Sequence, residues 1–248
     1  MTLLFNLFPS PLVLVGAIAI VVLAGIVQRS LGMGFGTIAA PLIALLDPAL
    51  VPFPVLLLGF GSALAGTVSE RHNVVWPEAA LVSFGRMIGA TLAVGILLLL
   101  PDQASFLIVF GGGILFALAL SAAGLNFRAT PYSLSAAGFV SGTMGTITSV
   151  GAPPLAIVYQ NADPQGARPT LAAIFMLGCA ISMLWLTLSG WGGWREVAQG
   201  LTLFPFMLLG VYLARFTTPG VARRFRPALW AISAFAAVIL ILRGIGWM

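Results

Sequence analysis

Two polar, glycine-rich interruptions in an otherwise apolar chain hold the residues best suited to binding a ligand. The candidate binding residues are Gln28, Arg29, Ser30, Gly32, Gly34 and Gly36 in the first interruption, and Ser141, Thr143, Gly145, Thr148, Ser149, Gly151, Pro153 and Pro154 in the second. A break inside a membrane helix exposes backbone groups, which is tolerated where protein or a water-filled cavity satisfies them. The helix that restarts after such a break presents free N–H groups and a positive dipole end. We therefore expect noncovalent binding of an anion at the interruptions.

The two interruptions resemble one another, which indicates a duplicated half. Residues 24–44 align without gaps on residues 137–157, and an Asp-Pro pair follows each copy. The identical pairs are Ala24/Ala137, Gly25/Gly138, Val27/Val140, Gly32/Gly145, Ala39/Ala152, Pro41/Pro154 and Leu42/Leu155. Broken segments at matching places in two halves are typical of substrate sites in secondary transporters. The alternative is that both are structural kinks, with Ser and Thr side chains bonded back to their own helices.

Arg86 is a further candidate because we expect it deep inside a membrane helix. It lies roughly 13 Å past Pro77 at 1.5 Å per residue, which is near the middle of a bilayer. An arginine at that depth is costly and is normally paired or functional. We predict that it either binds the anion or pairs with carbonyl groups. Glu78 lies about two turns away, too far for a firm contact within one straight helix.

The inventory of reactive side chains gives little support to catalysis. The single histidine, His72, lies in a polar loop, and the single cysteine, Cys179, lies in an apolar run where packing is expected. One His and one Cys cannot build the usual zinc site, and no HExxH, P-loop or Gly-x-Ser-x-Gly motif is present. We predict no enzyme activity, no catalytic residue, no metal site and no cofactor. Among the acids only Glu78 is expected along a membrane path, so a proton relay through buried acids is unsupported.

The composition excludes a soluble globular protein. Hydrophobic residues make up 60% of the chain and charged residues 7%, and the mean hydropathy is +1.11. Soluble domains carry roughly a quarter charged residues. The apolar runs are longer than barrel strands, which predicts an all-α integral membrane protein. All basic residues are arginine and no basic run resembles a nucleic-acid footprint, so no nucleic-acid partner is expected.

About ten apolar segments can be distinguished, the same number in each half. They are 12–28, 36–46, 50–69, 77–100 and 104–123, then 132–145, 151–160, 169–189, 196–214 and 227–246. The second segment of each half has about half of the roughly 20 residues that a spanning helix needs. The first two segments of each half therefore either both cross or form a hairpin that returns to the same face. We expect Pro77, Pro101, Pro131, Pro169 and Pro227 at helix starts or ends, and close helix approach at Gly85 and Gly89.

Both geometries give each half an odd number of crossings, so the halves are expected to be inverted-topology repeats. We assign residues 1–126 to the first repeat and 127–248 to the second, within one transmembrane domain. The loops on one side contain Arg71, Arg128, Arg168, Arg215, Arg223, Arg224 and Arg226, and those on the other contain Arg195 and Arg243. The positive-inside rule places the first side in the cytoplasm and both termini in the periplasm.

With these features the chain resembles the TauE/SafE family of sulfite exporters, also called the 4-toluene sulfonate uptake permease family. Residues 28–36 with 41–42, and 141–145 with 151–155, carry the resemblance, which extends over nearly the whole chain. The family usually shows Gly-Gly-Pro-Pro, and the methyl group of Ala152 departs from that pattern. The resemblance implies a bacterial inner-membrane transporter of small sulfur-containing anions such as sulfite, sulfonate or sulfoacetate.

The sequence thus predicts an alternating-access transporter that holds a small anion between residues 28–36 and 141–154 within a lipid bilayer. Export is expected, because a negative-inside potential drives anions outward by about 2.3 kcal/mol per charge per 100 mV. An uptake permease for another organic anion and a non-transport assembly factor are the alternatives. A homodimer is left open.

Overall fold

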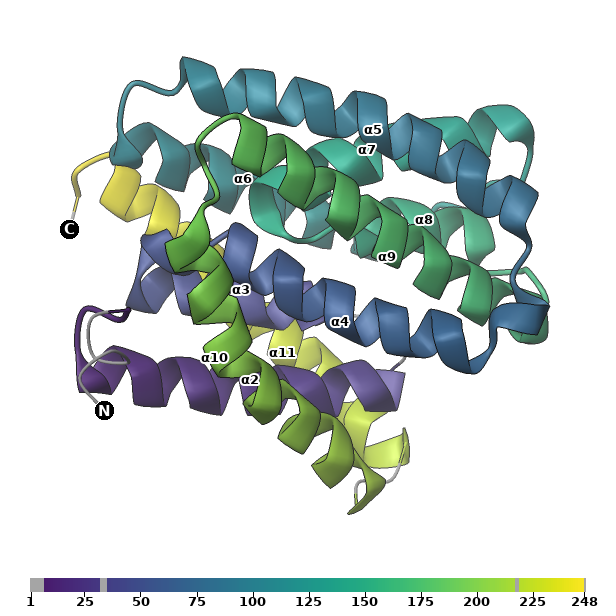
Figure 1. Ribbon diagram of the computed structural model, residues 1–248, viewed down its shortest axis with the longest axis horizontal. Coiled ribbons are helices and arrows are strands. Elements are labelled where there is room, and N and C mark those ends of the chain that lie inside the picture. Colours follow the sequence, from purple (N-terminus) through teal and green to yellow (C-terminus); the bar gives the residue numbers. More distant parts are fainter. Residues whose placement is uncertain (1–6, 32–34, 217–218, 248) are drawn as a thin grey trace.

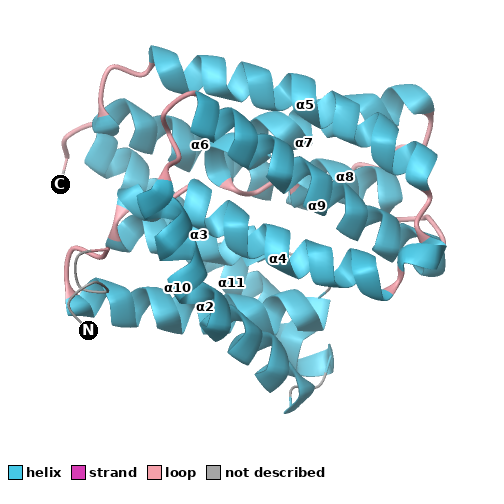
Figure 2. Ribbon diagram, viewed as in Figure 1, coloured by secondary structure: helices cyan, strands magenta, loops and turns pink. Residues whose placement is uncertain are grey.

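The apolar segments form α-helices, as their length and composition predict. The computed structural model describes residues 7–31, 35–216 and 219–247, and for 29–31 and 219–226 it describes the backbone alone. Within these ranges there are helices and short turns and no strand (Figure 2). Most helices lie alongside one another, and both chain ends lie at the same end of the molecule (Figure 1). The predicted all-α class is confirmed.

The helices match the predicted segments closely. The first half contains α2 (Pro11–Leu31), α3 (Phe35–Leu46), α4 (Phe53–Ser69), α5 (Trp76–Leu99) and α6 (Gln103–Ala122). The second half contains α7 (Pro131–Thr148), α8 (Ala152–Tyr159), α9 (Pro164–Leu188), α10 (Trp194–Leu213) and α11 (Pro219–Gly244). Three short 3-10 turns accompany them: η1 (Pro48–Leu50), η2 (Arg71–Asn73) and η3 (Ala214–Phe216). The predicted boundary at 126/127 falls in the connection between α6 and α7.

Prolines mark several helix starts, but two of them lie elsewhere than predicted. Pro77 and Pro131 lie in the first turns of α5 and α7, where the missing N–H has no partner to lose. The prediction was wrong for Pro169 and Pro227, which lie inside α9 and α11. A proline removes one helical hydrogen bond without forbidding the helix to continue. In α9, burial of Pro169 and Thr170 offsets that loss, and the Val75 N–H donates to Thr170 Oγ1 at 2.9 Å.

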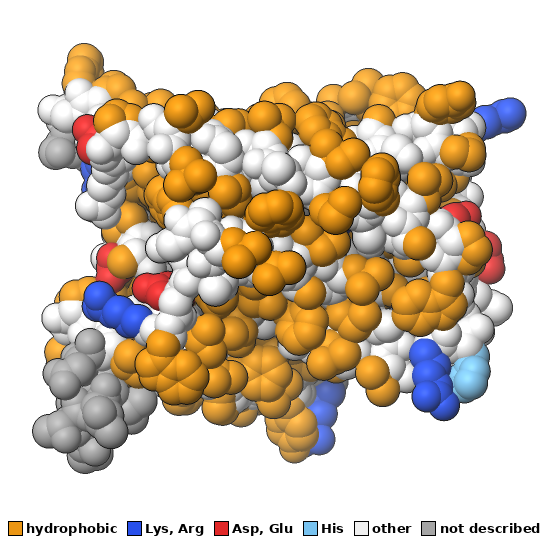
Figure 3. Space-filling model, turned by 45° about the horizontal axis from the view of Figure 1, so that its top comes forward, with side chains coloured by type: hydrophobic (Ala, Val, Ile, Leu, Met, Phe, Trp, Pro, Cys, Tyr) orange, Lys and Arg blue, Asp and Glu red, His pale blue; other side chains and the backbone are white. Residues whose placement is uncertain are grey.

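Seven segments of the described chain are long and apolar enough to cross a membrane by length and composition. They are Pro11–Gln28, Pro48–Ser69, Trp76–Leu99, Gln103–Ala122, Pro164–Leu188, Trp194–Phe216 and Pro227–Gly244. Helix α3 has 12 residues and α8 has 8, which give lengths of about 18 and 12 Å at 1.5 Å per residue. Figure 3 shows hydrophobic side chains over the middle of the visible face, with most charged side chains toward its two ends. This distribution fits a protein surrounded by lipid.

Both short helices return the chain to the end of the molecule from which it came. Gln160 Nε2 donates to the Leu125 carbonyl at 2.7 Å, so the end of α8 lies beside the loop that precedes α7. Arg243 Nη1 donates to the Leu45 carbonyl at 3.1 Å. The end of α3 therefore lies beside the end of α11, at the end of the molecule where the C-terminus lies (Figure 1). Since α8 is too short to cross, the re-entrant hairpin fits the second half. In the first half α2, about 31 Å long for its 21 residues, is long enough to span.

The two halves interlock, and their packing pairs recur with the halves exchanged. Helix α5 packs along α7 and α9, while α10 packs along α2 and α4. Equivalent helices also meet, α4 with α9 and α6 with α11. At the α5–α7 contact, a Cβ on Gly85 or Gly89 would overlap the carbonyl of Ser135 or Phe139. The predicted close approach at these two glycines is confirmed, and it fixes the helix that carries Arg86.

Candidate anion-binding site

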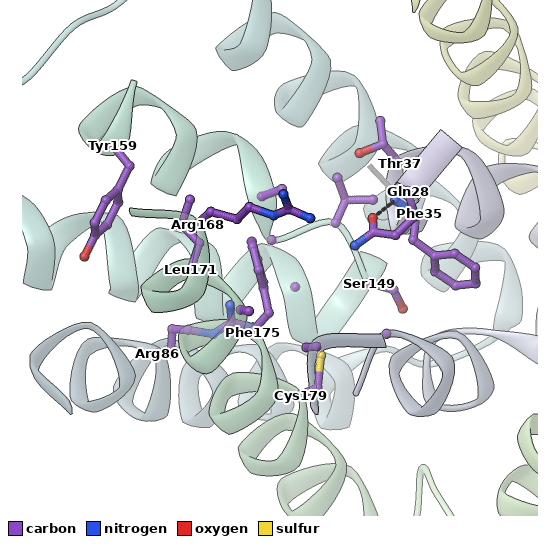
Figure 4. Close-up of a pocket in the computed structure, with 18 of the residues that line it drawn as sticks. Gln28, Phe35, Thr37, Arg86, Ser149, Tyr159, Arg168, Leu171, Phe175 and Cys179 are labelled. Atoms are coloured by element: carbon purple, nitrogen blue, oxygen red, sulfur yellow. Dashed lines mark hydrogen bonds between the residues drawn. The ribbon is translucent and has the colours of Figure 1, made fainter. Parts of the chain in front are cut away.

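A cavity of about 360 Å³ lies where the two interruptions meet (Figure 4). The first interruption contributes Gln28, Phe35, Gly36 and Thr37, and the second contributes Gly145, Ser149, Val150, Gly151 and Ala152. Helices α4, α5 and α9, with the end of α8 and the α8–α9 connection, complete the wall. The interruptions are in direct contact, because a Cβ on Gly36 would overlap the Ser149 carbonyl. Two segments far apart in the sequence therefore form one site.

Arg86 lies in the wall of this cavity, on α5, and is only 2% exposed. Its Nε and Nη1 atoms are buried without a hydrogen-bond partner among the described residues. The Phe175 ring lies 5.5 Å from the guanidinium carbon. A Cβ on Gly178 would overlap the guanidinium, and one on Gly145 would lie 3.4 Å from Nη2. The absence of a side chain at two glycines thus leaves space for this cation, and its Nε and Nη1 donors have no partner among the described residues.

The first interruption is held by the side chain of Gln28. The Phe35 N–H, at the start of α3, donates to Gln28 Oε1 at 3.0 Å. This bond closes the break from α2 to α3 with a side-chain acceptor, as an N-cap does. The amide nitrogen of Gln28 is left facing the cavity in Figure 4.

The second interruption is held by hydroxyl groups. Ser149 has a left-handed conformation (φ 61°), and its Oγ donates to the Pro52 carbonyl at 3.0 Å. Ser141 Oγ donates to the Gly151 carbonyl at 2.6 Å, and the Val150 N–H donates to Thr148 Oγ1 at 3.1 Å. These bonds fix the backbone between α7 and α8 in a non-helical path.

The start of α8 has fewer free N–H groups than we expected. Pro153 and Pro154 follow Ala152 directly, and proline has no backbone donor. Within the part of the chain that the structure describes, no acceptor is found for the N–H of Gly151 or Ala152. The donors that this interruption offers an anion are therefore two backbone N–H groups.

The cavity opens at the end of the molecule that holds the α8–α9 connection. The lining residues Gln160, Pro164 and Arg168 are exposed, whereas Leu56 and Val150 are buried. The loops with Arg71 and Arg128 lie at the same end, opposite the chain termini (Figure 1). A polar solute therefore has access from the arginine-rich end and is blocked at the other by buried side chains.

Comparison with known proteins identifies the family. Residues 17–241 match the family model described as sulfite exporter TauE/SafE. The chain belongs to the TauE/SafE sulfite exporter family. The resemblance seen in residues 28–36 and 141–155 is thereby confirmed. Searches of curated proteins and of solved structures found no match.

In this TauE/SafE protein, only some of the predicted binding residues line the cavity. Those that do are Gln28, Gly36, Arg86, Gly145, Ser149 and Gly151, and those that do not are Ser141, Thr143, Thr148, Pro153 and Pro154. Thr143 Oγ1 contacts the carbonyls of Gly89 and Phe139, and Thr148 Oγ1 donates to the Met144 carbonyl. Hydrogen bonds of this kind, from a hydroxyl to the backbone of its own helix, are what we expect if these residues only stabilise a structural kink. Arg29 and Ser30 belong to α2 with side chains outside the described residues, and Gly32 and Gly34 lie outside them altogether.

The sequence interpretation missed several lining residues of this TauE/SafE protein, above all Arg168. The sequence pattern predicts a helix that begins at Pro169, which places Arg168 in a loop. Since α9 begins at Pro164, Arg168 lies on a helix, on a face with Leu171, Phe175 and Cys179 that lines the cavity. Their spacing of three to four residues was the available signal. Tyr159 also lines the cavity, and its hydroxyl donates to Glu78 Oε2 at 2.8 Å.

Proposed function

We propose that this protein exports a small sulfur oxyanion, of the sulfite or sulfonate type, across the inner membrane of a bacterium. The observation that carries the proposal is Arg86, a buried cation beside the cavity at which the two helix breaks meet. Its Nε and Nη1 have no hydrogen-bond partner among the residues that the structure describes. A buried cation without a counter-charge is unfavourable in lipid. A bound anion would remove that cost.

The donors around the cavity suit an anion with several oxygens. A guanidinium binds two oxygens of one oxyanion through parallel N–H groups. Gln28, Gly151 and Ala152 line the same cavity, so the Gln28 amide and the two backbone N–H groups would bind further oxygens. A sulfite or sulfonate group has three oxygens, so both interruptions and Arg86 would share one headgroup.

We propose that the cavity opens to the cytoplasm. The loops with Arg71, Arg128 and Arg215 lie at the open end, and the positive-inside rule places such loops in the cytoplasm. Both termini would then be periplasmic. The exchanged packing pairs of the halves support an inverted repeat, in which rocking of the halves would open the opposite side. A cavity open inward is where an exporter loads its substrate, and the membrane potential favours outward movement of anions.

Flux measurements in liposomes test this function. Purified protein would be reconstituted under an imposed potential with sulfite, methanesulfonate, toluenesulfonate and acetate offered in turn. We expect potential-driven flux of at least one sulfur anion in preference to acetate, and its loss in Arg86→Gln. Arg86→Lys should retain part of the flux, because lysine keeps the positive charge but lacks the two parallel N–H groups that bind two oxygens of one anion.

Arg128→Gln is the matched control, because Arg128 is exposed at the same end and does not line the cavity. Unchanged flux in Arg86→Gln, or no flux of any sulfur anion, would contradict the proposal. Flux driven only inward in vesicles of known orientation would favour an uptake permease. Break-residue variants that alter stability alone would favour an assembly factor.

A further inference from the structure

We propose that Arg168 forms a second anion position at the mouth of the cavity, which captures the anion before it reaches Arg86. The inference rests on the proposed function, because it assumes that the cavity carries an anion. Arg168 would capture the substrate, whereas Arg86, deeper in the cavity wall, would bind it.

Arg168 has the position and freedom that capture requires. It lies in the first half of α9, its side chain is exposed, and it lines the cavity. In Figure 4 its guanidinium extends across the cavity toward Gln28. No hydrogen bond or ion pair to its side chain is found within the described ranges. Its donors are therefore available to a solute that enters the cavity by the mouth.

One face of α9 connects the mouth to the floor. Leu171, Phe175 and Cys179 follow Arg168 along the cavity wall, and Phe175 contacts the guanidinium of Arg86. The rise from residue 168 to residue 175 is about 10 Å at 1.5 Å per residue. In the view of Figure 4 the Phe175 ring lies between the two arginine side chains. The two cations therefore form successive positions, one exposed and one buried.

The difference in burial gives the two positions different roles. An exposed charge attracts an anion over about one Debye length, roughly 8 Å at physiological ionic strength, and binds it weakly. Low-dielectric walls around a charged mouth concentrate the opposite charge near it. Arg86 is almost fully buried, so it binds more strongly once the anion has lost its water. Arg168 should thus govern how often an anion enters, and Arg86 whether it is held.

The kinetic test separates these roles. In Arg168→Gln we expect the KM for sulfite or the transported sulfonate to rise by roughly tenfold at low ionic strength, with the maximal flux retained. The rise should shrink in high salt, where screening removes steering. Arg168→Lys should behave like the unaltered protein, and Arg128→Gln is the control for a charge at the same end. A KM equal to that of Arg128→Gln, or a loss of maximal flux independent of salt, would overturn the proposal.

A second test does not depend on transport. Cys179 is the single cysteine of the chain and lines the cavity beside Arg86, so a thiol reagent reports the potential inside. The probes are the anionic sulfonatoethyl and the cationic trimethylammonioethyl methanethiosulfonates, applied to detergent-purified protein. We expect the anionic reagent to react faster, and Arg168→Gln to reduce the anionic-to-cationic rate ratio severalfold relative to Arg128→Gln.

The two tests together distinguish the possible failures. A reduced labelling ratio without any flux of sulfur anions would support the capture role of Arg168 and reject the proposed substrate. An unchanged ratio would overturn the capture role even if Arg86 proves essential for flux. Cys179→Ser confirms that the label is on this thiol.

Discussion

The two interruptions meet the same backbone requirement with different chemistry. Between α2 and α3 a side-chain amide accepts the bond of the restarting helix, Phe35 N–H to Gln28 Oε1. Between α7 and α8 the hydroxyls of Ser141, Thr148 and Ser149 make the bonds. The first interruption is thus left with a side-chain donor toward the cavity and the second with backbone donors. The two breaks thus occupy corresponding positions in the aligned segments 24–44 and 137–157 but are held by different side-chain groups.

This difference explains which of the repeated residues face the cavity. A hydroxyl that caps a helix end or bonds back to it is not available to a ligand. The second interruption, although richer in Ser and Thr, therefore contributes fewer polar side chains to the site than its sequence suggests. Among the residues whose side chains the structure describes, the cations that line the cavity come from outside both interruptions, Arg86 from α5 and Arg168 from α9.

The largest effect is expected from separating the two interruptions. In Gly36→Val the new side chain would overlap the Ser149 carbonyl, and such overpacking costs about 1–3 kcal/mol. We expect flux in liposomes to be lost, with a lower melting temperature in detergent. Gly112→Val is the control, because a Cβ there meets no atom within 4 Å. Normal flux in Gly36→Val would show that contact between the interruptions is not required.

Next in size is the side chain that holds the first interruption. Gln28→Glu keeps an acceptor for the Phe35 N–H but adds a negative charge to the cavity. We expect a near-normal melting temperature and a strongly raised KM for the anion. Gln28→Leu loses the acceptor, which should lower the free energy of unfolding by about 0.5–1.5 kcal/mol. Equal KM values for Gln28→Glu and unaltered protein would remove Gln28 from the site.

The second interruption should respond in stability more than in affinity. Ser149→Ala loses the bond to the Pro52 carbonyl, a loss of about 0.5–1.5 kcal/mol, and keeps the left-handed conformation. Ser149→Gly loses the same bond but relieves the conformational cost, which is about 1–2 kcal/mol for a residue with a Cβ. Thermal unfolding should therefore rank Ser149→Gly above Ser149→Ala. The reverse order would mean that the left-handed conformation is not a source of strain.

The smallest effect is expected at a helix start that belongs to neither interruption. Asp102 caps α6, and the N–H of Ser105, which donates to its carboxylate at 2.8 Å, lowers the pKa of Asp102. A lowered pKa in the folded state means that the stabilisation is present above the ordinary value, near 3.9, and is lost as the pH falls through the folded value.

Asp102→Asn keeps an N-cap that does not titrate, while Asp102→Ala has none. Melting temperatures should differ slightly between the unaltered protein and Asp102→Ala at neutral pH, and converge in acid. The difference between the Asn and Ala variants should not depend on pH over this range. A gap between the unaltered protein and the Ala variant that widens in acid would contradict the assigned sign.

The sequence predicted the helices well, because each is a long apolar run bounded by polar or proline-containing residues. It erred where proline was taken as a boundary, at Pro169 and Pro227. The preference of proline for helix starts is a local rule, and it does not take into account that neighbouring helices bury the residues around Pro169. That one boundary also hid Arg168, which a helix beginning at Pro164 would have placed on the same face as Phe175.

The site was predicted in part for a similar reason. Arg86 could be found because a charge in the middle of an apolar run is costly wherever it faces. The roles of Ser141 and Thr143 could not, because a hydroxyl in a helix has partners both in its own backbone and in a cavity. The choice depends on side-chain direction relative to neighbouring helices, which neither composition nor spacing gives.

The sequence by itself determined the helical membrane architecture, the two interruptions and the family, since all three follow from local composition and order. Only the tertiary structure decided that the interruptions touch, that Arg86 Nε and Nη1 have no hydrogen-bond partner in the described parts of the chain, and that Arg168 reaches the same cavity. The physical reason is that burial and unused hydrogen-bond donors are properties of an assembled set of helices. They depend on the close α5–α7 contact and on the space at Gly178, which bring distant residues within reach of one another.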